Sequence, residues 1–242
     1  MACKGSSVRV RSAPPRNYFI SPRFFVRALC LLFCFVWGMV GIMLYIARHG
    51  QTQWNQENKI QGVHNISLNK TGVAQAKEVA QYFQSGNFDI KHIKSSDLRR
   101  AKQTARPIGK TLNIQVEYDS RLREYNFGQL EGRTPFSVSR ETLAQFMKNP
   151  QSIGCEPFED AFARISAVLD SIDYNTNTIL VSHGGIMRFA MYYFENGPVF
   201  DVQKFLDSWH KTHIGNASVF RVASRDSKME LFYQMNCINS QK

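Results

Sequence analysis

The sequence predicts an α/β fold, a three-layer sandwich in which helices cover both faces of a mainly parallel sheet. Short apolar runs without helical period alternate with amphipathic stretches along most of the chain. Two of these runs, 44–47 and 178–181, lead directly into polar, glycine-containing turns. Ligands of open α/β sheets collect at the carboxyl ends of the strands. We therefore expect the functional residues in these two turns.

Length and composition suit one globular domain over residues 43–242, preceded by an extension. The 242 residues are 43% hydrophobic and 20% charged, which is ordinary for a globular protein. Of the formal charge of +11, residues 1–42 carry +6 and no acid, so +5 remains for residues 43–242. A mildly basic domain suits a small anionic substrate, and no basic stripe with interleaved aromatics indicates nucleic acid. The five cysteines lack a CxxC pair, so reduced thiols are expected.

The N-terminal extension, residues 1–42, leaves three interpretations open. Residues 1–27 are basic and rich in Ser and Pro, which predicts disorder. Residues 28–47 are twenty uncharged positions, but a strand at 44–47 leaves sixteen of them, roughly 24 Å of helix against a hydrocarbon core of ~30 Å. In the first interpretation the extension is foreign to the fold, and the working protein starts at Met39 or Met43. In the second it is a membrane anchor through residues 28–44. In the third it is a cleaved signal, although its cleavage site is poor.

The stretch behind the first strand predicts a helix laid on a sheet, followed by two further strands. Asn69 stands at an N-cap position. The core face of the helix behind it is expected to hold Val73, Ala76, Val79, Ala80 and Phe83. Strands are expected at 88–93 and 114–118, and between them residues 95–97 form an N-cap cluster with Asp97, which opens a helix through Thr111.

The second half of the chain repeats this alternation. Residues 121–132 predict a charged loop punctuated by glycine, and residues 135–148 are amphipathic. The helix expected at 157–172 has a core face of Phe158, Ala161, Phe162, Ile165, Val168 and Leu169. A strand at 178–181 precedes a helix from Ile186 to about Phe194, and a closing pair of strands is expected at 217–222 and 228–237.

Four polar segments, in this order and at these intervals, resemble the histidine phosphatase superfamily in its phosphoglycerate mutase-like branch. Residues 48–55 match the pattern Arg-His-Gly-x-Thr-x-x-Asn in full, and residues 96–104 match Ser-Asp-Leu-x-Arg-Ala-x-Gln-Thr. Residues 122–132 match the acid block, although Leu130 stands where the family often has Trp, and residues 181–185 match the last block. A Gly-Glu-Ser motif is kept only in part at Glu156, whose role stays open. The resemblance covers residues 43–237 and implies a phosphoglycerate mutase-like fold of the broad-specificity phosphatase type.

The chemistry of phosphate esters explains why these residue types are needed. A phosphomonoester carries nearly two negative charges, so its oxygens must be neutralised before a nucleophile can reach phosphorus. Arg48 and Arg100 can each present a bidentate fork to them. His183 is expected as a protonated donor beside the dianion, and the helix beginning near Gly184 is expected to direct its amino end at the phosphate. The resemblance thus implies the phosphate- or substrate-binding residues Arg48, Thr52, Asn55, Gln61 and Arg100.

The resemblance also implies the catalytic residues His49, Glu124 and His183. His49 is the expected nucleophile, a neutral imidazole with one nitrogen held as N–H by a nearby carbonyl while the other attacks phosphorus to form phosphohistidine. Glu124 is expected to protonate the leaving alkoxide and later to accept a proton from the attacking water. Glu131 is interpreted as a neighbour that shapes the loop, while Arg99 and Arg123 are left between surface charge and substrate contact.

No metal and no cofactor are expected. The remaining histidines have no carboxylate or cysteine partner at ligand spacing, and we interpret them as structural or surface residues: His64, His92, His210 and His213.

The expected function is hydrolysis of small phosphorylated metabolites in the cytoplasm, without a nucleic-acid partner. Mutases of the family carry a long insertion after the acid block, whereas here only residues 125–155 separate Glu124 from Glu156. The triplet His183-Gly-Gly is also more typical of the phosphatases. A phosphoglycerate mutase, a membrane-tethered protein phosphatase and a non-catalytic phosphate-sensing module are the alternatives. The segments 56–67 and 134–157 hold few charges, which predicts a tolerant pocket for partly apolar phosphoesters rather than bisphosphates.

Overall fold

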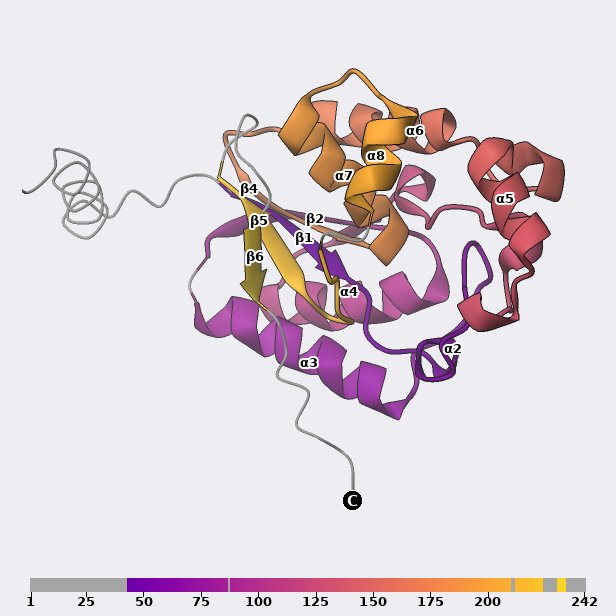
Figure 1. Cartoon of the computed structure of the whole chain (residues 1–242). Coiled ribbons are helices and arrows are strands. Elements are labelled where there is room, and N and C mark those ends of the chain that lie inside the picture. The colour runs from indigo at the N-terminus through magenta and orange to yellow at the C-terminus, as the bar shows by residue number, and fades with distance from the viewer. Residues whose placement is uncertain (1–42, 87, 210–211, 224–229, 234–242) are drawn as a thin grey trace, which may run out of the picture. The chain divides into compact units, whose positions relative to one another are not determined.

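The computed structural model describes residues 43–86, 88–209, 212–223 and 230–233. Its centre is a six-stranded sheet with the strand order β3-β2-β4-β1-β5-β6 (Figure 1). The strands are β1 (Leu44–Arg48), β2 (Ile90–Ser95), β3 (Val116–Tyr118), β4 (Asn177–Ser182), β5 (Val219–Val222) and β6 (Glu230–Tyr233). The pairs β3–β2, β2–β4 and β4–β1 are parallel, and β5 and β6 add an antiparallel edge. The prediction of a mainly parallel sheet is confirmed.

Helices cover both faces of this sheet. On one face lie α3 (Lys70–Ser85) and α4 (Arg99–Leu112), and on the other lie α6 (Phe158–Asp170), α7 (Gly184–Asn196) and α8 (Val202–Ser208) (Figure 1). Two shorter helices, α2 (Gln53–Gln56) and α5 (Arg140–Lys148), stand in the connections. Single 3₁₀ turns occupy Ser120–Leu122, Gly128–Leu130, Pro135–Ser137 and Pro150–Ile153.

The alternation of side chains along β1 explains the three layers. Leu44 and Ile46 pack into the core beneath α6, α7 and α8, whereas Tyr45 and Ala47 pack into the core beneath α3 and α4. Successive residues of a strand point to opposite faces, so a strand that is apolar at every position is buried on both sides. The continuous apolar run in the sequence therefore specifies a central strand.

The register of the sheet brings the two histidine turns together. Strands β1 and β4 are parallel neighbours, and Arg48 pairs with Ser182 at their last residues. Because each strand ends at this pair, His49 and His183 follow at the same edge of the sheet, with ring centroids 5.2 Å apart. This is the carboxyl edge, where the sequence placed the functional residues.

Two details of the helices differ from the sequence expectation. Asp97 does not cap α4: the N-cap position is Leu98, without a side-chain cap bond, and the Asp97 carboxylate binds Arg123 at 2.6 Å. In α3 the expected core residue Val73 is exposed, and Gln75 is buried in its place. The predicted cap of that helix is confirmed, because the Asn69 side chain accepts a hydrogen bond from the backbone N–H of Gly72 at 2.8 Å.

Other expectations fall partly or wholly outside the described residues. Helix α8 was not anticipated, and of the last predicted strand, 228–237, only residues 230–233 are described as β6. The predictions for the extension 1–42, for His210 and for the cysteines other than Cys155 lie outside the described residues. Within the ranges that are described, no helix combines the length and the apolar composition needed to cross a membrane.

Two glycines allow α3 to pack directly on the turn after β1. A Cβ atom on Gly50 would lie 2.5 Å from the Gly72 carbonyl oxygen, and one on Gly72 would lie 2.0 Å from the Gln51 carbonyl oxygen. Both distances are shorter than any real contact of a Cβ atom, and the neighbours are backbone atoms that cannot rotate away. The close approach of helix and turn therefore requires both glycines.

This contact predicts the sign of a helix substitution. Alanine normally stabilises a helix position relative to glycine by about 1 kcal/mol. Here we expect Gly72→Ala to lower the free energy of unfolding by about 1–3 kcal/mol, because the new methyl group overpacks the turn. Chemical denaturation checks this, with Thr71→Ala, at an exposed position of the same turn, as a control that changes stability by less than about 0.5 kcal/mol. A Gly72→Ala variant that is more stable than the wild type would contradict the account.

Candidate active site

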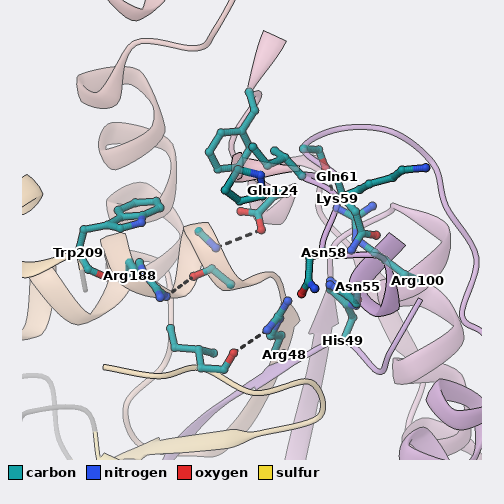
Figure 2. A pocket seen from close by; sticks show the side chains of 17 residues that line it. Arg48, His49, Asn55, Asn58, Lys59, Gln61, Arg100, Glu124, Arg188 and Trp209 are labelled. Atoms are coloured by element: carbon teal, nitrogen blue, oxygen red, sulfur yellow. Dashed lines mark hydrogen bonds between the residues drawn. The ribbon is translucent and has the colours of Figure 1, made fainter. Parts of the chain in front are cut away.

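A cavity of about 370 Å³ opens at the carboxyl edge of the sheet (Figure 2). The turn after β1, the loop 58–62, the start of α4, the acid block and the start of α7 all contribute to its wall. The predicted site residues among its lining are Arg48, His49, Asn55, Gln61, Arg100 and Glu124. Thr52 and His183 are buried but do not line it. The structure therefore brings together predicted site residues that lie up to 76 positions apart, from Arg48 to Glu124, around one cavity.

The ring of His49 is held in one orientation and in one tautomer. Its Nδ1 lies 2.7 Å from the carbonyl oxygen of Gly50, as the sequence led us to expect. Because a carbonyl oxygen only accepts hydrogen bonds, Nδ1 carries the proton and Nε2 keeps its lone pair. The ring is 2% exposed, and burial together with the positive charges of Arg100 and Arg48 lowers the pKa of His49 well below 6.5. His49 is thus a neutral imidazole with one unprotonated nitrogen.

His183 is neutral as well, whereas the sequence expectation of a protonated donor concerns the ring beside a bound phosphate and stays a prediction. Its Nδ1 accepts from Nε of Arg100 at 3.1 Å, and its Nε2 lies 2.8 Å from Oγ of Ser96. Since the Arg100 N–H only donates, the proton of His183 is on Nε2. Burial first, and then the neighbouring Arg100, lower the pKa of His183 well below 6.5. In the ligand-free site this histidine orients Arg100 and adds no positive charge.

Two guanidinium groups lie in the wall of the cavity, with Arg100 fully buried and Arg48 partly buried. Arg100 is fully buried and donates to the carbonyl oxygens of His64 and Gly62 at 2.7 Å each, so the loop 61–64 fixes its direction. Arg48 donates from Nη1 to the carbonyl of Ile214 at 2.5 Å, and its Nε has no hydrogen-bond partner among the described residues. Burial lowers the pKa of each to about 10, against the opposing influence of Glu124. Both stay charged at neutral pH, and an anion in the cavity would relieve their burial.

Glu124 occupies the amino end of α7. Its carboxylate accepts hydrogen bonds from the backbone N–H groups of Gly185 at 3.0 Å, Ile186 at 3.1 Å and Tyr125 at 2.9 Å, and Figure 2 shows one of these bonds. The sequence led us to expect these helix N–H groups at the phosphate, and the structure gives two of them to the acid instead. A Cβ atom on Gly185 would lie 2.5 Å from Oε1 of Glu124, so this glycine makes room for the carboxylate.

Thr52 and Asn55 form a positioning pair behind the cavity. Thr52 caps α2: its Oγ1 accepts from the Asn55 backbone N–H at 3.1 Å, and the Asn55 side-chain oxygen accepts from the Thr52 backbone N–H at 3.1 Å. The Asn55 oxygen also accepts from Nδ2 of Asn216 at 3.1 Å. Because this oxygen is used inside the protein, Asn55 presents its amide N–H₂ group as a donor. Gln61 contributes a buried Oε1 that has no partner among the described residues.

The cavity lining also contains Arg188 and Trp209, which the sequence reasoning missed, and Lys59, which lies in the loop 56–67 expected to set specificity. Arg188 lies one helical turn after Gly184 on α7, and this spacing was a usable signal. Its Nε donates to the carbonyl of Trp209 at 2.8 Å, and its guanidinium lies over the Trp209 ring at 5.1 Å. Lys59 and Trp209 come from connections without any sequence pattern. Four cationic side chains and one carboxylate therefore line the cavity, and of the few charges that the segments 56–67 and 134–157 hold, only Lys59 is among them.

Glu131 shapes the loop, as predicted. Its carboxylate accepts from the backbone N–H groups of Val63 and Phe127 at 3.0 Å each, and it binds the ring of His64. His64, interpreted from the sequence as a structural or surface residue, is a structural partner of this carboxylate. Since the carbonyls of residues 62 and 64 hold Arg100, Glu131 supports that arginine through the loop.

Glu156, left open by the sequence, acts as a structural partner. Its carboxylate binds Arg164, at 2.7 Å from Nε and 3.0 Å from Nη2. Arg164 in turn donates to the carbonyls of Arg121, Arg123 and Glu124. The pair thus fixes the backbone that carries the acid. The Arg123 guanidinium group forms an ion pair with the Asp97 carboxylate, and the Arg99 side chain is exposed. Among the described residues, no group of three His, Cys, Asp or Glu side chains is arranged to hold a metal ion.

Comparisons with known proteins agree with this geometry. The sequence matches the family described as Histidine phosphatase superfamily (branch 1) over residues 44–235. It is 36% identical over 152 residues to a probable phosphoglycerate mutase GpmB of Salmonella paratyphi A, an overlap of 59% of this chain and 70% of the relative.

Two solved structures are similar over most of the chain. One is a phosphoserine phosphatase from Entamoeba histolytica in complex with 3-phosphoglyceric acid, with 26% identity, a TM-score of 0.62, and 79% of this chain and 95% of that one covered. The other is a mycobacterial glucosyl-3-phosphoglycerate phosphatase in complex with VO3, with 26% identity, a TM-score of 0.64, and 79% of this chain and 97% of that one covered.

The two neutral histidines predict how stability changes with pH. In the unfolded chain each imidazole takes up a proton below about pH 6.5, whereas the lowered pKa values keep both rings neutral in the folded protein. Stability is therefore fully present above this pH and falls as the pH drops, by up to about 1.4 kcal/mol per pH unit for each histidine. Urea denaturation of the wild type and of His49→Gln between pH 7 and pH 5 checks this. Between pH 7 and pH 5 the free energy of unfolding should fall less in the variant than in the wild type. An equal dependence on pH in both proteins would contradict the assignment of a neutral His49.

Proposed function

Because the chain belongs to the histidine phosphatase superfamily, branch 1, we propose that it hydrolyses small phosphomonoesters through a phosphohistidine on His49. The observation that carries this proposal is the cavity in which an unprotonated imidazole nitrogen, two guanidinium groups and one carboxyl group converge (Figure 2). The names of the two structural neighbours, both phosphatases of small phosphorylated compounds, support hydrolysis.

The first half-reaction transfers the phosphoryl group to the protein. Arg48 and Arg100 bind the phosphoryl oxygens, and Nε2 of His49 attacks phosphorus opposite the ester oxygen. The phosphorus–nitrogen bond forms as the phosphorus–oxygen bond breaks, and the leaving alkoxide takes a proton from Glu124. The negative charge of the bound phosphate favours the protonated form of this carboxyl group. The alcohol then departs, and phosphohistidine remains.

Water completes the cycle in the second half-reaction. Glu124 accepts a proton as the water oxygen attacks phosphorus, the phosphorus–nitrogen bond breaks, and its electron pair returns to Nε2 of His49. Inorganic phosphate is released, and the starting protonation of both groups is restored. The orphaned Oε1 of Gln61 can accept a hydrogen bond from the attacking water or from the substrate.

The charge of the cavity limits the substrate class. Arg48, Arg100, Arg188 and Lys59 face a single carboxylate in its lining, which is more positive charge than one phosphate group neutralises. We therefore expect small phosphoesters that carry further polar or negative groups rather than simple apolar ones. The expected location in the cytoplasm stays a prediction.

Phosphoglycerate mutase is the second candidate, because a relative at 36% identity is named a probable phosphoglycerate mutase. The two activities share the phosphohistidine and differ in whether water or a second alcohol receives the phosphoryl group. The short segment 125–155 favours hydrolysis, as argued from the sequence.

An activity assay separates these functions. Purified protein is incubated with a panel of small phosphomonoesters, including 3-phosphoglycerate, in the presence of a chelator, and released phosphate and 2-phosphoglycerate are both measured. We expect phosphate release to exceed isomer formation, and His49→Ala to lower it by about 10³-fold or more. His92→Ala, which removes an exposed histidine from β2, serves as the control and should retain activity. Isomer formation faster than phosphate release, or full activity of His49→Ala, would overturn the proposal.

Two adjacent glycines offer a matched test of Glu124. A Cβ atom on Gly185 would displace the carboxylate, whereas one on Gly184 would meet Nε of Arg48 at 3.4 Å, an ordinary contact. We expect Gly185→Ala to lower kcat by about 10²-fold, toward the loss caused by removing a general acid, and Gly184→Ala to lose much less. Steady-state kinetics and circular dichroism of both variants check this. An equal loss of kcat in the two variants would contradict the claim that Gly185 leaves the space that Glu124 needs.

A further inference from the structure

A second cavity of about 370 Å³ adjoins the first. The two cavities share five lining residues, which are Arg48, Asn55, Asn58, Lys59 and Pro135. Because Arg48 and Asn55 belong to both walls, a ligand whose phosphate lies against Arg48 in the first cavity can extend its other end into the second. The second cavity is completed by residues that have no role in the proposed chemistry: Gln51, Gln75, His213, Gly215 and Asn216.

Carboxamides dominate this lining. Half of its ten residues carry a side-chain amide: Gln51, Asn55, Asn58, Gln75 and Asn216. The lining contains no Asp or Glu and no Phe, Tyr or Trp. A flat aromatic base would therefore find no phenyl, phenol or indole ring to stack on, and an acyl chain would find little apolar surface.

The protein uses one end of four of these amides, while the other end makes no hydrogen bond with the described residues and is not among the buried side-chain atoms without a partner. The side-chain oxygens of Gln51, Asn55 and Gln75 accept hydrogen bonds from the Asn69 side chain, the Asn216 side chain and the Gln51 backbone N–H, at 2.9, 3.1 and 2.7 Å. Asn216 is turned the other way, because its Nδ2 donates to Asn55 and to the carbonyl of His49. The cavity thus offers several fixed N–H₂ donors and one carbonyl acceptor.

Gln75 is the most informative of these residues. It lies on α3 at a position that is only 6% exposed, where the helix otherwise buries small or apolar side chains. A buried carboxamide costs free energy unless its hydrogen-bonding groups are satisfied. Its Oε1 is satisfied by the turn after β1, and its Nε2 makes no hydrogen bond with any residue that the structure describes. A ligand oxygen in the second cavity would satisfy it.

We propose that the second cavity binds a hydroxyl-rich group, a polyol or glycosyl unit, attached to the phosphate that reacts in the first. A hydroxyl oxygen accepts from the amide donors while its proton is donated to Oδ1 of Asn216, a pairing that neither an alkyl chain nor a carboxylate can make. The proposal rests on the proposed phosphatase function and names its substrate class, a phosphorylated polyol or sugar derivative. Lys59 and Arg48, at the junction, bind the charged end of the same molecule.

Matched substrates of one chain length test this. The value of kcat/KM is measured for hexitol 6-phosphate, hexyl phosphate and the six-carbon sugar acid 6-phosphogluconate, with ethyl phosphate as a substrate that fits the first cavity alone. We expect hexitol 6-phosphate to exceed hexyl phosphate by about tenfold or more, since several net hydrogen bonds are gained. Equal values, or a higher value for hexyl phosphate, would overturn the proposal.

Substitutions in α3 test whether the second cavity causes the preference for hexitol 6-phosphate over hexyl phosphate. Gln75→Met removes the donor at nearly constant volume and should reduce the ratio of hexitol to hexyl phosphate toward one, while Gln81→Met, at an exposed position of α3, should leave the ratio at its wild-type value. If Gln75→Met does not fold, Gln51→Met on the turn after β1 tests the same wall. A ratio that survives in the folded variants would overturn the proposal. A preference for 6-phosphogluconate over the hexitol phosphate that Gln75→Met abolishes would also overturn it, because the cavity then selects an anion.

Equilibrium binding separates this inference from the proposed function. If no phosphoester is hydrolysed, including ethyl phosphate, the phosphatase assignment fails. Titration calorimetry of hexitol 6-phosphate against hexyl phosphate on the wild type then still tests the cavity. Tighter binding of the hexitol, reduced by Gln75→Met and not by Gln81→Met, supports the second site, and equal binding rejects it.

Discussion

The site depends on the burial of two guanidinium groups that the protein neutralises only in part. Arg48 and Arg100 lie in the wall of a cavity whose lining contains one carboxylate, and burial lowers the pKa of each. Uncompensated charge in a low dielectric is costly, and a dianion removes that cost. Burial, and then the same positive charges, lower the pKa of His49 and of His183 and keep both rings neutral. One electrostatic imbalance therefore attracts phosphate and also keeps the imidazole of His49 able to attack it.

Backbone geometry holds these groups in place. Parallel pairing of β1 with β4 ends at Arg48 and Ser182, so the two histidine turns share one edge of the sheet. The glycines at 50 and 72 let α3 pack on the first turn, and the glycine at 185 leaves space for Glu124 at the start of α7. The carbonyl groups of Gly62 and His64 orient Arg100, and Glu131 binds the loop that carries them. Such supporting residues do not contact the substrate, but they hold the site residues in their geometry.

Much of this could be predicted from the sequence, for physical reasons. The apolar runs and helical spacing specify the layered sheet, because burial on both faces leaves a continuous hydrophobic pattern in β1. The cap assigned to Asp97 was wrong because a tertiary ion pair with Arg123 outweighed a local bond. In α3 the apolar Val73 was expected in the core and is exposed, whereas Gln75 is buried one turn before Val79, because a hydrophobic pattern does not identify a buried position that holds a polar side chain. Lys59 and Trp209 reach the site from irregular connections, where only the folded backbone decides proximity. The domain boundary at residue 43 and the roles of the site residues remain predictions.

Rapid-quench trapping of the covalent intermediate tests the central claim most directly. Wild-type protein is mixed with a phosphomonoester, quenched in alkali, where phosphohistidine persists, and analysed by peptide mass spectrometry. The account predicts one phosphorylated residue, His49, modified at Nε2, since its Nδ1 is held by the Gly50 carbonyl. Phosphate found on His183 or on a serine, or turnover with no labelled residue at any time point, would contradict it.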